Sequence, residues 1–288
     1  MASHLERLVY LNGEYMHGGE AKVSIFDRGL LFADAVYEGL GIRNGRIIDF
    51  EKHMARLKRS LGELNIPEPL SKDELQRVFS TLITKNQMSE GFIYLHITRG
   101  EADRDYVYQG NTRANVFAFV QPPEGGGASG ELKGVSMRSH PDLRWKRRDI
   151  KTSNLLGQVM AKNAADDAGD YEALMVDEDG IVTEGGATSF FIVKDKQLFV
   201  RPVTNEILHG ITRQSMLQVA ALMDIEIVET TFTLEQAYAA DEAFLTGAAS
   251  YIQPVVAIDG KEIGGGSPGQ VTLALLQVYL KHCDSGEI

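Results

Sequence analysis

The sequence predicts an α+β fold in two domains. The chain has 288 residues, which is enough for two domains of ordinary size. Its 43% hydrophobic and 24% charged residues are typical of a globular protein with a packed core. The stretch 121–130, QPPEGGGASG, has the proline, glycine and serine content of a flexible linker. We therefore expect a smaller N-terminal α/β domain over 1–120, an interdomain linker over 121–130, and a larger C-terminal β-rich domain with surrounding helices over 131–288.

Short strands and two helices are expected in the first domain. Residue type predicts strands at 8–11, 22–25, 39–43, 46–49, 91–99 and 114–120. The pair Asn44-Gly45 lies between two of them and is a strong hairpin signal. Apolar residues at helical spacing predict a helix over 51–64. A second helix should begin at Ser71, which has Glu74 three residues later for a capping box.

The second domain should contain more strands than helices. Residue type predicts strands at 135–138, 173–176, 181–183, 189–193, 197–200, 225–228, 243–246 and 255–258. Apolar periodicity predicts helices at about 154–168, 212–223, 234–239 and 269–281. The order of these elements favours a sheet with helices packed around it.

Composition excludes several classes of function. The net charge of −11 argues against a nucleic-acid partner, because a phosphate backbone requires a basic surface. Cys283 is the single cysteine, so no internal disulfide or thiolate metal site is expected, and a reducing, cytoplasmic location is the default. The seven histidines lack the spacing of metal ligands. We also expect neither a secretory signal nor a membrane span.

Lys151 has an unusual setting. It follows a basic cluster, Arg144, Lys146, Arg147 and Arg148, and precedes a predicted helix. Positive neighbours disfavour the charged form of an amine, and an uncharged lysine can act as a Schiff-base nucleophile. Most lysines are nevertheless solvated surface groups, so this pattern alone leaves both interpretations open.

Glu184 lies between a predicted strand and a Gly-Gly turn, where a carboxylate can be held rigidly. An amine that captures an aldehyde and an acid that keeps a pyridine nitrogen protonated are what pyridoxal phosphate (PLP) chemistry requires. A glutamate in this position is more often part of an ordinary turn. Glu184 is therefore a candidate only in combination with Lys151.

A phosphate site is predicted where a helix begins after Gly210. Glycine allows close approach, and Ile211 and Thr212 offer free backbone N–H groups at the helix N-terminus. The small residues 246–249 after a strand could form a second anion nest. Arg56, on the first predicted helix, could pair with a phosphate, although most helix arginines contact solvent.

Several motifs in consistent order resemble the class IV (fold type IV) PLP-dependent aminotransferases. They are DIKTSNLLG around Lys151, VTEGG around Glu184, ILHGITR, and LTGAASYIQPV. The stretches VYLNGEY, DRGLLFADAVYEG, YLHITRG and RRDIKTSNLLG most resemble the D-amino-acid transaminases. The resemblance covers about residues 9–263, so it extends over nearly the whole chain.

The resemblance implies a role for each matching residue around PLP. Lys151 would form the Schiff base and move a proton between the substrate Cα and the cofactor C4′. Glu184 would pair with the pyridine nitrogen, and Leu208 would pack against the cofactor ring. The positions that match the phosphate site are Arg56, Ile211, Thr212, Gly247 and Ala248.

The resemblance also implies the substrate site. Tyr37 matches a tyrosine that lines the pocket. Arg104 and Tyr106 lie in the loop RGEADRDY, which in the D-amino-acid enzymes reaches across a homodimer interface to bind the substrate carboxylate. Those enzymes typically have histidine in place of Tyr106, and a phenol carries no positive charge at neutral pH. At Ala248 a threonine hydroxyl is common in the family, so only a backbone N–H remains here.

The sequence thus predicts a PLP-dependent transaminase that moves an amino group between a D-amino acid and a 2-oxo acid. The nearest alternatives are a branched-chain L-amino-acid or an (R)-amine transaminase. The segment EGGATS differs from the EGxGEN pattern of the branched-chain enzymes and counts against that branch. A PLP lyase of the aminodeoxychorismate type and a non-catalytic binding module remain further alternatives.

Overall fold

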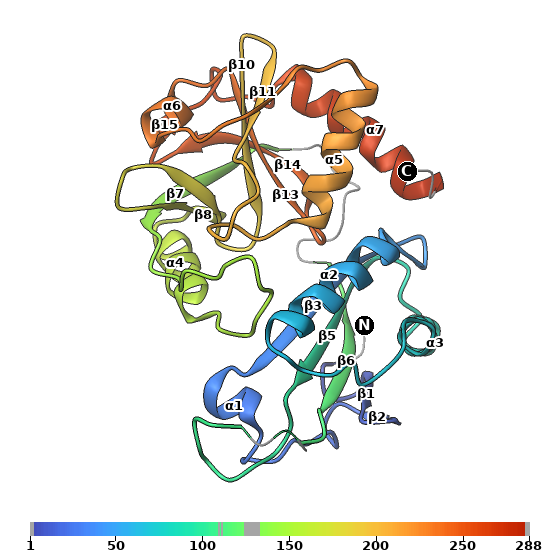
Figure 1. The fold of residues 1–288 in the computed structure, drawn as a ribbon. Coiled ribbons are helices and arrows are strands. Elements are labelled where there is room, and N and C mark those ends of the chain that lie inside the picture. The colour runs from blue at the N-terminus through green and yellow to red at the C-terminus, as the bar shows by residue number, and fades with distance from the viewer. Residues whose placement is uncertain (1–2, 109, 111, 124–132, 286–288) are drawn as a thin grey trace. The chain divides into compact units, whose positions relative to one another are not determined.

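The computed structural model describes residues 3–108, 110, 112–123 and 133–285. The chain folds into two compact units, which Figure 1 shows in one view. Unit 1 comprises Met1–Gly127 and Ile150–Asn154, and unit 2 comprises Ala128–Asp149 and Leu155–Ile288. Across the described residues, no helix has the length and apolar character needed to cross a membrane.

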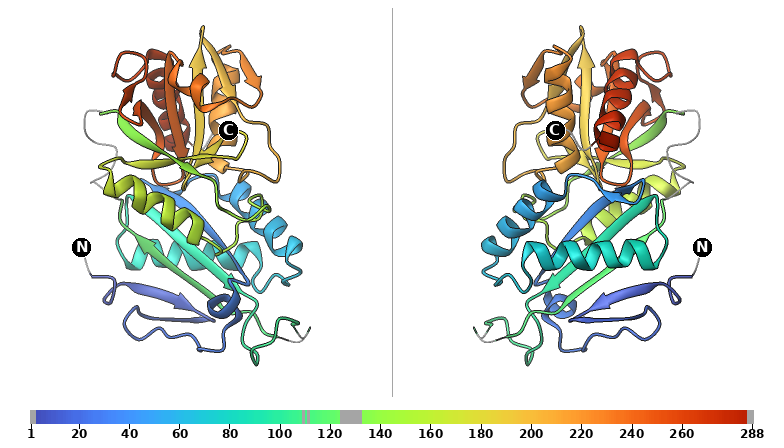
Figure 2. Two further views of the ribbon diagram at one scale, coloured as in Figure 1. Left: turned by 90° about the vertical axis from the view of Figure 1, so that its left-hand side faces the viewer. Right: turned by 90° about the vertical axis from the view of Figure 1, so that its right-hand side faces the viewer.

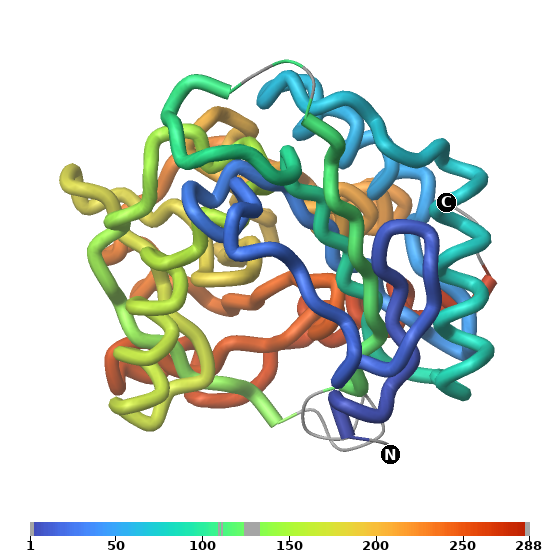
Figure 3. Tube along the Cα trace, turned by 90° about the horizontal axis from the view of Figure 1, so that it is seen from below, coloured from blue at the N-terminus to red at the C-terminus, as the bar shows by residue number. Residues whose placement is uncertain are grey.

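Unit 1 is built on a six-stranded antiparallel sheet. Its strand order is β2 (Glu14–His17), β1 (Leu8–Leu11), β6 (Val116–Gln121), β5 (Gly91–Thr98), β3 (Ala35–Arg43) and β4 (Arg46–Ile47). Figure 3 shows the β1–β2 hairpin beside β6. The predicted strand at 22–25 is wrong. Asn12 and Gly13 both have positive φ, so the chain reverses after two residues and β2 pairs with β1 directly.

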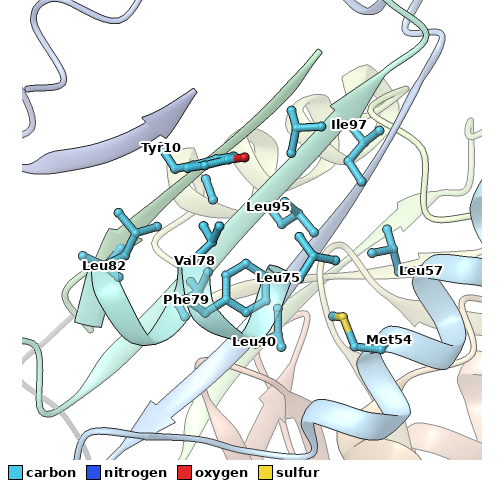
Figure 4. Close-up of a cluster of buried hydrophobic side chains, with 14 of the residues drawn as sticks. Tyr10, Leu40, Met54, Leu57, Leu75, Val78, Phe79, Leu82, Leu95 and Ile97 are labelled. Atoms are coloured by element: carbon cyan, nitrogen blue, oxygen red, sulfur yellow. The ribbon is translucent and has the colours of Figure 1, made fainter. Parts of the chain in front are cut away.

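Two helices cover one face of this sheet. They are α2 (Phe50–Glu63) and α3 (Lys72–Lys85), and α3 crosses β1 and β6 (Figure 2). The predicted capping box is confirmed, because the Ser71 and Glu74 side chains each bond the other residue's backbone N–H. Apolar side chains from the sheet and both helices form the core in Figure 4, including Leu40, Leu57, Phe79 and Leu95.

The opposite face of the same sheet carries aromatic rings. Tyr94 stacks on Tyr37 and Phe119, and His96 stacks on Phe117 with ring centroids 4.7 Å apart. The Tyr94 hydroxyl lies 2.8 Å from His96 Nδ1. Burial lowers the pKa of His96 from 6.5 to about 4, because the charged imidazole is poorly solvated there. His96 is therefore neutral in the folded protein near pH 6.

This lowered pKa predicts a loss of stability in mild acid. The unfolded chain binds a proton at His96 near pH 6.5 and the folded chain only near pH 4, so the free energy of unfolding falls as the pH drops between these values. The shift corresponds to at most about 3 kcal/mol. We expect His96→Phe, which keeps the ring stack, to flatten this part of the stability–pH curve in urea unfolding. His17→Gln, at an exposed position, should leave the curve unchanged. An equal slope in wild type and His96→Phe would contradict this account.

Unit 2 is built on a mixed nine-stranded sheet. The order is β12 (Ile227–Glu229), β11 (Gln197–Val200), β10 (Ser189–Lys194), β13 (Glu242–Gly247), β14 (Tyr251–Ile258), β7 (Val135–Pro141), β8 (Glu172–Val176) and β9 (Val182–Gly185), and β15 (Lys261–Glu262) pairs with β14. The pairs β11–β12, β14–β7 and β7–β8 are parallel, and the other pairs are antiparallel. All eight strands predicted for this region correspond to observed strands.

The helices of unit 2 pack on this sheet. α4 (Leu156–Asp167) contacts β7 and β8, whereas α5 (Ile211–Leu222) and α7 (Gln270–Ser285) lie side by side against β13 and β14 (Figure 1). α6 (Leu234–Tyr238) is a short helix with a capping box between Thr233 and Gln236. Together with unit 1, this arrangement confirms the predicted α+β class.

The predicted domain boundary is only partly described. Gln121 ends β6, and the rest of the predicted linker from 124 onward lies outside the described residues. The segment Ile150–Asn154 groups with unit 1, although the sequence placed it in the C-terminal domain. This segment contains Lys151, so its return to unit 1 determines which side chains surround the predicted nucleophile.

Candidate active site

Lys151 is anchored to unit 1 through its backbone. Tyr37 N–H donates to the Lys151 carbonyl at 3.0 Å, and Lys151 N–H donates to Ser60 Oγ at 3.3 Å. Thr152 forms an antiparallel β-bridge with Val36, so the segment around Lys151 pairs with β3 at this point. The Lys151 ammonium nitrogen lies 4.1 Å from the centre of the Tyr37 ring. The structure therefore brings together two of the predicted site residues, Lys151 and Tyr37.

The basic cluster before Lys151 is compensated by carboxylates. Arg144 and Arg148 both pair with Asp142, and Arg147 pairs with Asp149. All these residues belong to unit 2. Each of these guanidinium groups therefore has a carboxylate partner, which lowers the net positive charge of the cluster. Lys151 remains a candidate through its family match and its contact with Tyr37.

Glu184 lies near the end of β9 and is 5% exposed. Arg144 Nη1 donates to Glu184 Oε1 at 2.5 Å, and the Leu208 N–H donates to both carboxylate oxygens at 3.2 Å. Burial raises the pKa of Glu184 above its ordinary value, while the charge of Arg144 and the N–H of Leu208 oppose that rise. The Arg144 side chain and the Leu208 backbone N–H thus hold the Glu184 carboxylate in one orientation. At Leu208 the structure shows a backbone N–H donor to Glu184, and packing of its side chain against a cofactor ring stays a prediction.

A second carboxylate holds Arg144 in place. Asp142 accepts hydrogen bonds from Arg144 Nε and Nη2 at 2.9 and 2.7 Å, and from Thr183 Oγ1 at 2.7 Å. Burial acts to raise the pKa of Asp142, but these hydrogen bonds and the arginine charge outweigh it, and the pKa is lowered. Arg144 therefore stays charged beside Glu184. The sequence pointed to Arg144 only as part of a basic cluster and missed its pairing with Glu184.

The N-terminus of α5 forms a cradle suited to an anion. Gly210 is the N-cap residue, and the first N–H groups of the helix, from Ile211 and Thr212, have no intrahelical acceptor. A Cβ at Gly210 would lie 2.7 Å from Ser189 Oγ, so a larger residue here would require the Ser189 side chain to move. Ser189 is the cross-strand neighbour of Thr246, and both side chains therefore lie on the same face of the sheet.

Thr246 supplies an orphan hydroxyl to this region. The residue is 2% exposed, and its Oγ1 has no hydrogen-bond partner among the described residues. The next residue is Gly247, where a Cβ would lie 2.8 Å from Ser250 Oγ. A buried donor without a partner costs free energy unless a ligand satisfies it. The cradle of N–H groups, glycines and hydroxyls therefore fits a phosphate.

Arg56 is buried rather than solvated. It lies on α2, is 8% exposed, and donates from Nε and Nη2 to Glu38 at 2.8 and 2.7 Å. The carboxylate partner Glu38 was not singled out from the sequence. It follows Tyr37 directly on β3, so the two side chains point to opposite faces of the sheet.

The predicted substrate residues Arg104 and Tyr106 lie in an exposed loop. The Arg104 guanidinium lies 5.3 Å from the Phe32 ring centre and 5.4 Å from that of Tyr106. Arg28 holds the loop main chain by donating to the carbonyls of Asp105 at 2.6 Å and Tyr106 at 3.4 Å. The loop is thus anchored through its backbone, while the Tyr106 side chain is 76% exposed.

The parts of the chain that the structure describes contain no group of three or more His, Cys, Asp or Glu side chains that could hold a metal ion. Unit 1 provides a lysine beside a tyrosine, and unit 2 provides a fixed buried carboxylate and an anion cradle. These groups are what an enzyme with a phosphorylated organic cofactor requires.

Comparison with known proteins assigns the class. The family model described as Amino-transferase class IV matches residues 35–258. The chain therefore belongs to the class IV aminotransferases. These enzymes depend on PLP, so the chain is a PLP-dependent aminotransferase whose substrates are amino donors and 2-oxo acids.

Individual relatives cover nearly the whole chain. A D-alanine aminotransferase of Bacillus licheniformis is 38% identical over 92% of this chain and 93% of its own length. A putative branched-chain-amino-acid aminotransferase of Methanocaldococcus jannaschii is 36% identical over 94% of both chains. Among solved structures, a branched-chain amino acid aminotransferase of Escherichia coli has a TM-score of 0.89 at 27% identity and covers 96% of this chain and 95% of its own.

Proposed function

We propose that the chain is a transaminase that moves an amino group between a D-amino acid and a 2-oxo acid, with PLP attached to Lys151 as a Schiff base. The main support for a D-amino acid as the amino donor is the 38% identity, over nearly the full length, to a D-alanine aminotransferase. A second D-alanine aminotransferase, from Staphylococcus haemolyticus, is 34% identical over 96% of the chain. The departure of EGGATS from EGxGEN supports the same choice.

The residues assigned to the cofactor are those with suitable chemistry. Bound PLP supplies an aldehyde for the amine and an electron-withdrawing pyridine ring. Glu184, held by Arg144 and Leu208, would place a carboxylate beside the ring nitrogen and so favour the protonated form of that nitrogen. The phosphate would be bound by Arg56 together with the α5 N-terminus and its neighbours, namely Ile211, Thr212, Gly247 and Ala248.

Lys151 is assigned the proton transfers. After the substrate amine has displaced Lys151, the free Lys151 amine would take the proton from the substrate Cα. It would then return the proton at the cofactor atom C4′. A positioned amine of this kind typically contributes about 10²–10⁴-fold to the rate. The backbone bonds to Tyr37 and Ser60 fix the Lys151 main chain, and the Tyr37 ring limits where its nitrogen can lie.

Substrate carboxylate binding is assigned to Arg104 and Tyr106. Arg104 supplies the positive charge, and the Tyr106 phenol can donate one hydrogen bond. Because tyrosine replaces the usual histidine, Arg104 alone of these two residues contributes a positive charge. We further propose that the enzyme is a cytoplasmic homodimer in which this loop serves the partner's site, and sedimentation of the purified enzyme would test the oligomeric state.

A branched-chain L-amino-acid transaminase is the second candidate. It is supported by the 36% identity to the Methanocaldococcus jannaschii relative and by the branched-chain enzymes among the solved structures. Both candidates require the same cofactor residues, so the cofactor site does not discriminate between them. The discriminating property is the configuration of the amino donor.

An amino-donor panel tests the proposed function. The purified enzyme would receive D-alanine, D-glutamate, L-leucine or (R)-1-phenylethylamine, with pyruvate or 2-oxoglutarate as acceptor. We expect a D-amino acid to be the fastest donor, measured as formation of its 2-oxo acid. Inert D-donors with active L-leucine would overturn the proposal in favour of the branched-chain class. The visible absorbance of the same preparation shows whether cofactor is bound and so excludes a binding module without PLP.

A further inference from the structure

A buried carboxylate holds the predicted phosphate ligand Arg56. Glu38, on β3, is completely buried and receives Arg56 Nε on one oxygen at 2.8 Å and Nη2 on the other at 2.7 Å. His53, three residues before Arg56 on α2, places its Nδ1 2.7 Å from Glu38 Oε2. His53 is 3% exposed and Arg56 is 8% exposed. The three side chains thus form one buried polar cluster, which we call the Glu38 cluster.

The protonation states of the cluster follow from its contacts. Burial acts to raise the pKa of Glu38, but the charge and hydrogen bonds of Arg56 and the hydrogen bond of His53 outweigh it and lower the pKa. Burial lowers the pKa of His53. Glu38 is therefore an anion at neutral pH, and the neutral His53 ring donates its Nδ1–H to the carboxylate.

Stability alone does not explain this cluster. Burying charged groups carries a large desolvation cost, and apolar residues of the same volume often stabilise a core as well or better. What a two-point carboxylate–guanidinium contact supplies is geometry, because it fixes the plane of the guanidinium group. His53 adds a second constraint by fixing one oxygen of Glu38.

We propose that Glu38 and His53 are positioning residues that hold the Arg56 guanidinium in the orientation in which it binds the cofactor phosphate. This inference rests on the proposed role of Arg56. Glu38 engages two of the three guanidinium nitrogens and neutralises the charge of the group. Arg56 then acts on the phosphate through the direction of its N–H groups more than through net charge. A lysine ammonium has no such fork and could not be held in the same way.

The test compares PLP with pyridoxal, which lacks the phosphate. The full-length chain, freed of cofactor, would be titrated with each compound, and binding would be followed by the visible absorbance of the bound compound. We expect Glu38→Gln and Arg56→Met each to weaken PLP binding about tenfold or more, since one charge-assisted contact is lost. Pyridoxal binding should be unchanged in both. The double variant should bind PLP no more weakly than Arg56→Met alone, because both changes remove the same contact.

Two controls separate positioning from a general loss of stability. Asp34→Asn removes another carboxylate of unit 1, which pairs with the largely buried Arg28 and Arg99. It should lower the unfolding temperature but leave the ratio of PLP to pyridoxal affinity unchanged. His53→Phe removes the donor to Glu38 and should lower that ratio, whereas His53→Asn, whose amide can still donate, should restore most of it.

The measured affinities distinguish a failure of the positioning role from a failure of the phosphate-binding role of Arg56. If Arg56→Met selectively weakens PLP but Glu38→Gln changes neither compound, or both compounds equally, the positioning role is wrong and the role of Arg56 stands. If Arg56→Met leaves the affinity ratio unchanged, the role of Arg56 in the proposed function fails, and the positioning role with it. Should Glu38→Gln not fold, an unchanged affinity ratio in His53→Phe would overturn the inference.

Discussion

Replacing Lys151 with alanine is expected to abolish transamination and the visible absorbance of the bound cofactor. The variant loses both the amine that binds the aldehyde and the base that moves the Cα proton. Loss of the proton transfer alone should lower kcat by up to about 10⁴-fold, and loss of the covalent bond should lower it further. Steady-state kinetics with the best donor of the panel and an absorption spectrum measure the two effects separately.

The matched control for this change is Lys146→Ala. Lys146 is an exposed lysine of the preceding basic cluster, so its removal changes the net charge by the same amount. It should leave kcat and the spectrum close to those of the wild type. A Lys151→Ala protein that kept its absorbance and turnover, or a Lys146→Ala protein that lost them, would show that the nucleophile has been assigned to the wrong lysine.

Glu184→Gln should lower kcat about 10²–10³-fold, the range typical for removal of one preorganised electrostatic contact. The amide carries no charge to stabilise a protonated ring nitrogen, although it can still accept from Arg144 and the Leu208 N–H. The cofactor should remain attached to Lys151, so the loss should appear in kcat while visible absorbance persists. Stopped-flow measurement of the first half-reaction with the D-amino donor would report the proton-transfer step directly.

The control for Glu184→Gln is Glu178→Gln, at an exposed turn of the same unit. It makes the same chemical change away from the Arg144 pair and should leave kcat unaltered. If Glu184→Gln changed kcat by less than about threefold, a charged partner for the ring nitrogen would have to come from another residue.

Elements with strong local signals could be predicted from the sequence. The capping box of Ser71 and the apolar periodicity of α2 depend on residues within one or two turns, and both were confirmed. The strand predicted at 22–25 failed because its residues were β-prone but the Asn12-Gly13 turn had already supplied β1 with a partner. Local propensity does not determine which strand pairs, because pairing is a tertiary event.

The residues of the candidate site also differ in whether the sequence alone could predict them. Lys151, Glu184 and Gly210 carry local signals, such as a turn or a helix start, and their order along the chain strengthened them. The ion pairs of the site join residues far apart in the sequence: Arg56 and Glu38 are 18 residues apart, and Arg144 and Glu184 are 40 residues apart. A charged residue in a sequence does not reveal which opposite charge folding will bring to it. Glu38 and the pairing of Arg144 therefore became apparent only in the folded chain.

The attachment of PLP to Lys151 underlies every role proposed for the other site residues, and it can be tested without measuring activity. Borohydride reduction of the purified holoenzyme converts a Schiff base between PLP and a lysine into a stable secondary amine. Peptide mapping by mass spectrometry then identifies the modified residue. We expect one phosphopyridoxyl group per chain, on Lys151 in the peptide that begins Asp149-Ile150. Labelling of a different lysine, or a reduced protein without label, would contradict it.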